Sequence, residues 1–110
     1  MVTAAALLIG VMLSAAAPPG RLVKEVTPAC QSREWMQRLW AQLGAENEAG
    51  FMAIVHDGIS KKQCIKWEKG KRVAVEAESK DPPLLCVKPF GSKMPCYWTF
   101  EFDLLRDSDH

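Results

Sequence analysis

Four cysteines are the residues of this 110-residue chain with the best-defined chemistry: Cys30, Cys64, Cys86 and Cys96. Their spacings contain neither the close C-x2-C pairs of structural zinc sites nor the C-x-x-C of redox-active thiols. An even number of cysteines in a short secreted chain is typical of a disulfide framework. We therefore expect two disulfides, no metal and no cofactor.

The pairing that we favour joins Cys86 to Cys96 and Cys30 to Cys64. Residues 88–95 are rich in turn-forming residues and could bring the ends of the shorter loop together. The main alternative joins Cys30 to Cys96 and Cys64 to Cys86. Each bridge should contribute roughly 2–4 kcal/mol, mostly by restricting the unfolded chain.

Acid–base chemistry has one candidate centre. His56 could act as a general base with Glu76 or Glu101 as a second carboxylate, as in a small ribonuclease. Nothing in the spacing forces these groups together, so we favour a surface histidine beside a turn. The chain has no nucleophile elbow, phosphate-binding glycine loop or paired-histidine metal motif, and we assign no catalytic residue.

Basic residues gather in the middle of the chain: Lys61, Lys62, Lys66, Lys69, Lys71 and Arg72. Acidic residues are more frequent later, so charge is polarised although the formal net charge is only +1. Such a cluster could bind a polyanion such as a sulfated glycan, RNA or an anionic lipid surface, with an exposed Trp67 adding stacking. The alternative is that the lysines keep a hairpin soluble while Trp67 lies in the core.

The loop between Cys86 and Cys96 is a second candidate for recognition, because disulfide-closed loops often carry binding residues. It holds Phe90 and Met94, although Phe90 could instead tuck under its own loop. The binding residues predicted for the two segments together are Lys66, Trp67, Lys69, Lys71, Arg72, Phe90 and Met94.

The first 17 residues contain no charged side chain and include the apolar run 4–13. The run is too short to cross a membrane and ends in small residues, which is typical of a signal peptide. We place cleavage after Ala16, with Ala17 and an uncleaved interfacial anchor as alternatives. The expected organisation is a signal peptide (1–16), a flexible mature N-terminus (17–29), one domain (30–106) and a polar tail (107–110).

One helix is predicted over 32–43, because Ser32 is a good N-cap, Gly44 a stop signal, and the apolar residues between them form one stripe. Strands are expected over 51–56, 63–68, 72–78, 84–87 and 96–105. The strands over 63–68 and 72–78 should form a hairpin, with Gly70 in the left-handed region of backbone conformation. The fold class is therefore α+β: one N-terminal helix packed on a mostly antiparallel sheet of about five strands, around a single core.

A helix followed by antiparallel strands, with Cys86 and Cys96 late in the chain, resembles the cystatin-like fold in outline. The Q-x-V-x-G motif of those inhibitors is absent, since residues 66–71 read KWEKGK. A late Pro-Trp is also missing, so the resemblance implies topology only.

These observations favour a secreted, monomeric, disulfide-stabilised binding protein of the effector, toxin or extracellular-ligand type. Its partner would be an extracellular protein or a polyanion, a sulfated glycan rather than nucleic acid, and the mature chain would have no transmembrane segment. The alternatives are a small ribonuclease-like enzyme centred on His56 and a cystatin-like protease inhibitor.

Overall fold

The computed structural model describes residues 20–106, so the predicted signal peptide and polar tail lie outside the described residues. The described part contains seven strands, two helices and one short 3-10 helix. The strands are β1 (Gly20–Val23), β2 (Thr27–Cys30), β3 (Cys64–Trp67), β4 (Arg72–Lys80), β5 (Pro83–Pro89), β6 (Tyr97–Phe100) and β7 (Leu104–Arg106). The helices are α2 (Arg33–Gly44) and α3 (Glu48–Ser60), and the 3-10 helix is η1 (Glu101–Asp103).

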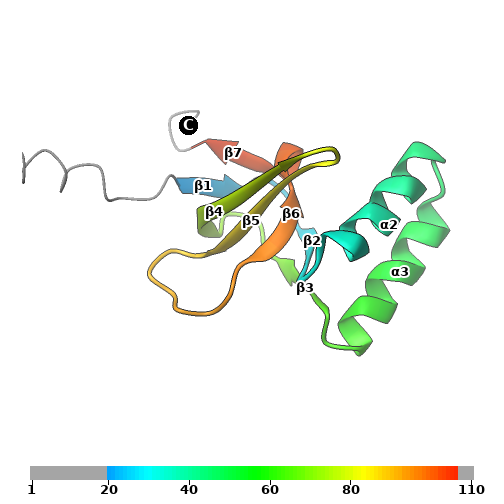
Figure 1. Cartoon of the computed structure of the whole chain (residues 1–110), viewed down its shortest axis with the longest axis horizontal. Helices are drawn as coiled ribbons and strands as arrows, with labels where there is room; N and C mark the ends of the chain where they lie inside the picture. Colours follow the sequence, from blue (N-terminus) through cyan, green and yellow to red (C-terminus); the bar gives the residue numbers. More distant parts are fainter. Residues whose placement is uncertain (1–19, 107–110) are drawn as a thin grey trace, which may run out of the picture.

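The seven strands form one antiparallel sheet, which is strongly curved (Figure 1). β4 pairs with β1 and β5, and β5 pairs with β6. β6 in turn pairs with β2, which follows β1 after a bend of three residues. Because the pairing returns to the segment where it began, the sheet has a concave inner face and a convex outer face.

Two cores lie on these two faces, where the sequence predicted one. The inner core draws on strands alone and therefore fills the concave face; it consists of Val23, Ala29, Trp67, Val73, Leu85, Val87 and Leu104. The outer core lies between the sheet and the helices; it consists of Cys30, Met36, Leu39, Val55, Cys64, Leu84 and Phe100. Adjacent residues of one strand serve both cores, since successive side chains point to opposite faces.

α2 is the helix that the sequence predicted. The Ser32 hydroxyl caps it by accepting a hydrogen bond from the Trp35 N–H at 3.4 Å. Met36 and Leu39 are its fully buried residues. Two strands precede it, so the prediction of an N-terminal helix was wrong in its placement.

α3 replaces the strand that was predicted over 51–56. Asn47 caps this helix, its side chain accepting a hydrogen bond from the Gly50 N–H at 2.9 Å. A short apolar run does not distinguish a strand from a buried helix, and interior glycines lower helix propensity. Gly58 is nevertheless required, because α3 passes very close to Cys64 at that position.

The predicted hairpin is absent: β3 pairs with β2, and β4 pairs with β1 and β5. Residues 68–71 form a bend in which Gly70 has a φ of 85°, as expected for its position. The Gly70 N–H donates to the Val23 carbonyl at 2.8 Å, which holds the bend against β1. Alternating apolar residues fit any antiparallel neighbour. Of the true neighbours, β5 was predicted as a strand, whereas β1 and β2 were not.

The N-terminal segment is a further correction. Of the residues predicted to be flexible, 20–23 and part of 27–30 are strands of the sheet. Each is four residues long, too short to show alternation, and Pro28 interrupts the pattern.

The last predicted strand is broken by η1. Phe100 belongs to the outer core, Phe102 is exposed, and Leu104 belongs to the inner core. The alternation of aromatic residues therefore does not mark one continuous face. The α+β class and antiparallel pairing are confirmed, with more strands and one more helix than predicted.

Candidate functional site

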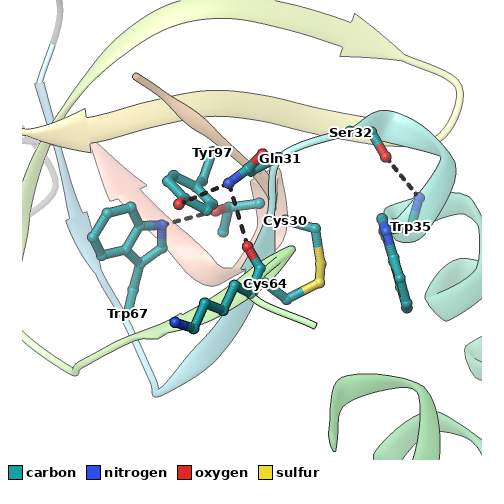
Figure 2. Close-up of a disulfide and its surroundings, with 9 residues drawn as sticks. Cys30, Gln31, Ser32, Trp35, Cys64, Trp67 and Tyr97 are labelled. Atoms are coloured by element: carbon teal, nitrogen blue, oxygen red, sulfur yellow. Dashed lines mark hydrogen bonds between the residues drawn. A yellow bond between two sulfur atoms is a disulfide. The ribbon is translucent and has the colours of Figure 1, made fainter. Parts of the chain in front are cut away.

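Both disulfides have the favoured pairing, and the alternative pairing was wrong. Cys30 and Cys64 lie directly opposite each other on β2 and β3 (Figure 2). Cys86 and Cys96 close the loop between β5 and β6. The first bridge lies beneath the helices, and the second fixes both ends of the loop between Cys86 and Cys96.

The bend and the disulfide-closed loop lie side by side. The Arg72 guanidinium stacks over the Phe90 ring at 4.4 Å from its centroid. The Phe90 N–H donates to the Arg72 carbonyl at 3.3 Å. Lys69 and Lys71 are exposed in the same bend. We call Lys69, Lys71, Arg72 and Phe90 the bend–loop surface.

Three other predicted binding residues lie elsewhere. Trp67 is 5% exposed in the inner core, and its indole N–H donates to the Thr99 hydroxyl at 3.0 Å. The stacking role proposed for an exposed Trp67 was therefore wrong; its ring lies edge-on to Tyr97 (Figure 2). Met94 is half-buried against the inner core, and Lys66 lies on the outer face beside α3.

Two lysines of the bend–loop surface, Lys69 and Lys71, form no ion pair with a carboxylate of residues 20–106. The ion pairs between described lysines and carboxylates join Lys61 to Asp57, Lys80 to Glu78 and Lys88 to Glu76. None of them uses Lys69 or Lys71. These two ammonium groups are therefore available to an anionic ligand.

The predicted acid–base centre is not assembled by any contact in the described part of the chain. His56 is exposed on α3, and its side chain has no hydrogen bond or ion pair within residues 20–106. Glu76 is on β4, where it pairs with Lys88 at 2.7 Å, and Glu101 is in η1. Within residues 20–106, no three His, Cys, Asp or Glu side chains gather as metal ligands.

An apolar groove runs along α3 and was not predicted from the sequence. One hollow of about 390 Å³ lies between the end of α2 and the start of α3, lined by Leu43, Phe51 and Met52 among others. A second, of about 150 Å³, lies between α3 and β2–β3 and shares Phe51 and Met52 with the first. The spacing of 51, 54, 55 and 58 was a helical signal that could have revealed it.

Asp103 is a half-buried carboxyl of η1 that contacts the bend between β1 and β2. Burial raises its pKa above the ordinary value of 3.8, and the nearby Glu25 raises it further. A hydrogen bond from the Thr27 hydroxyl, at 2.8 Å, and the positive charge of Lys24 oppose this rise. Deprotonation of Asp103 therefore favours the unfolded chain.

We expect Asp103→Asn to become more stable, relative to the parent protein, as pH rises from 3 to 7. The native state holds the Asp103 proton more tightly than the unfolded state. The protonated carboxyl therefore stabilises the parent protein at low pH, and this stabilisation is lost as pH rises through the raised pKa. Thermal unfolding at several pH values measures the difference. A free energy of unfolding of Asp103→Asn that falls relative to that of the parent as pH rises would contradict the assignment.

No protein-family model, curated protein or solved structure matches this chain. No helix in residues 20–106 is long and apolar enough to cross a membrane.

Proposed function

We propose that this chain is a secreted, disulfide-stabilised binding protein whose bend–loop surface binds a sulfated glycan. The observation that carries the proposal is the stacking of Arg72 on Phe90 at 4.4 Å, which joins the basic bend to the disulfide-closed loop. The two disulfides are compatible with an oxidising extracellular compartment. The apolar run and small residues at the N-terminus support secretion.

The geometry favours a sulfated glycan over single-stranded nucleic acid. Sequence-tolerant binding of nucleic acid uses exposed aromatic rings on which bases stack. Trp67 is buried, and one side of the Phe90 ring is covered by Arg72. Clustered ammonium and guanidinium groups need only the spaced negative charges that a sulfated polysaccharide provides.

We expect the double variant Lys69→Ala/Lys71→Ala to elute from heparin at lower salt than the parent. Each lost contact should reduce the logarithmic salt dependence by about one unit. Arg72 is kept, because its stacking on Phe90 also supports the loop.

The matched control is Lys61→Ala/Lys80→Ala, which removes the same charge from lysines paired with Asp57 and Glu78. This control should elute close to the parent. Equal elution of parent and Lys69→Ala/Lys71→Ala, or equal shifts of both double variants, would reject the bend–loop surface as the glycan site.

No observation favours the two alternatives as strongly. A cystatin-like inhibitor would need a projecting hairpin, whereas the Lys69–Lys71 bend is held to β1 by the Gly70 hydrogen bond. A ribonuclease-like enzyme would need a second group beside His56, and the described contacts supply none.

A further inference from the structure

Five of the seven large hydrophobic residues exposed in the described part of the chain lie along the helical hairpin and the bends that face it. They are Val26, Trp40, Leu43, Met52 and Phe102. Scattered apolar residues are ordinary at a protein surface, but a contiguous set marks an interaction site. We call this set the apolar face.

Three members of the apolar face line two hollows. Leu43 and Met52 line the larger hollow, and Val26 and Met52 line the smaller one. The other two, Trp40 and Phe102, lie outside both hollows, with their ring centroids 6.4 Å apart. The two hollows are therefore parts of one groove along α3, with Phe51 and Met52 as the ridge between them.

The groove exists because the hairpin of α2 and α3 extends beyond the sheet (Figure 1). Leu39 is completely buried, whereas Leu43, one turn nearer the hairpin tip, is 41% exposed. On α3, Val55 is buried, whereas Met52, three residues nearer the tip, is 38% exposed. Along this face of the hairpin, burial therefore falls toward the tip on both helices.

Charge defines what the groove can accept. Glu46 and Glu48 are exposed at the tip and line the larger hollow, which has no basic residue among its lining. Lys66 lines the smaller hollow at the opposite end. A ligand that fits is apolar along its length, positive at the tip end and negative or neutral at the Lys66 end.

We propose that this groove binds an amphipathic helix of a partner protein, with its basic N-terminal end toward the hairpin tip. Helices recognised in this way place apolar residues at i, i+3, i+4 and i+7 into successive hollows. The positive end of the helix dipole then faces Glu46 and Glu48, and the negative end faces Lys66. The flexible thioether of Met52 suits a ridge that adapts to such side chains.

The first test is titration of the oxidised full chain, labelled with ¹³C at its methionine methyls. The probe is a synthetic Leu/Lys peptide with leucines at i, i+3, i+4 and i+7. The Met52 methyl should shift saturably, while buried Met36 and loop Met94 stay constant. A Leu/Glu peptide of the same pattern and a scrambled Leu/Lys peptide should bind about tenfold more weakly.

The second test compares variants by anisotropy of the labelled Leu/Lys peptide. Met52→Gln should weaken binding about tenfold, whereas Ile59→Gln should leave it unchanged. Ile59 is the matched control, because it lies on the same helix with the same 38% exposure but outside the groove. Glu46→Gln/Glu48→Gln should also weaken binding, whereas Lys69→Ala/Lys71→Ala should not.

Several results would overturn the proposal. One is a shift at Met94 in place of Met52, which would put the peptide at the loop. Others are equal binding of the Leu/Glu peptide, equal effects of Met52→Gln and Ile59→Gln, or no saturable binding of any helix. If a small dye such as ANS shifts Met52 while no peptide does, the groove is a small-molecule site and the partner-helix proposal fails.

Discussion

Replacing Cys30 and Cys64 with serine is expected to lower the free energy of unfolding by about 4 kcal/mol. The same change at Cys86 and Cys96 should cost about 3 kcal/mol, since the loops span 34 and 10 residues and a longer loop loses more freedom when it is closed. Cys30 and Cys64 are also buried in the outer core, where serine hydroxyls would lose their hydration. Loss of the Cys30–Cys64 bridge should therefore lower the free energy of unfolding more than loss of the Cys86–Cys96 bridge.

Urea unfolding of the two double variants measures this order directly. A small domain has only about 5–15 kcal/mol of net stability, so losing the first bridge removes a large part of it. If the Cys86–Cys96 variant proves the less stable, the loop-length argument does not govern this protein.

Gly58→Ala is expected to lower the free energy of unfolding by about 2–3 kcal/mol. A Cβ at this position would lie 2.5 Å from Cys64 Sγ and 3.0 Å from Cys64 Cβ. Neither atom can move away easily, because Cys64 is paired on β3 and bonded to Cys30. The better helix propensity of alanine, about 1 kcal/mol, offsets only part of this strain.

Gly44→Ala is the matched control for that prediction. Gly44 is the last residue of α2, and a Cβ there would have no neighbour within 4 Å. This variant should be as stable as the parent or slightly more stable. Equal losses for both glycines would show that α3 does not depend on close contact with the disulfide.

The parts of the fold that were predictable are those with local signals. α2 has a cap at one end and a glycine at the other, and the favoured disulfides follow from a short, turn-rich loop. β1 and β2 have no such signal, because their partners are distant in the sequence and each strand is only four residues long. α3 was not predicted because its short apolar run, 51–56, fits the period of a strand as well as that of a helix.

The candidate sites, like the fold, have parts with a local signal in the sequence and parts without one. The basic bend was visible as a cluster in the sequence, but only the structure brings Arg72 against Phe90. Alternation placed Ile65 and Trp67 on one face without showing that this face is the inside of a curled sheet. The groove along α3 was not predictable, because it depends on where the sheet ends relative to the hairpin tip.

The closed path of strand pairing also has a consequence for the order of assembly. β2 pairs with β6, and β1 pairs with both β4 and β7. The first two strands therefore complete their hydrogen bonding only when the end of the chain is available. During synthesis, the α2–α3 hairpin and the Cys30–Cys64 bridge require only residues up to 64. Such non-local pairing is slow, because loop-closure entropy is lost before the contacts are gained. The cross-linked hairpin can thus serve as a scaffold on which the emerging C-terminal strands close the sheet.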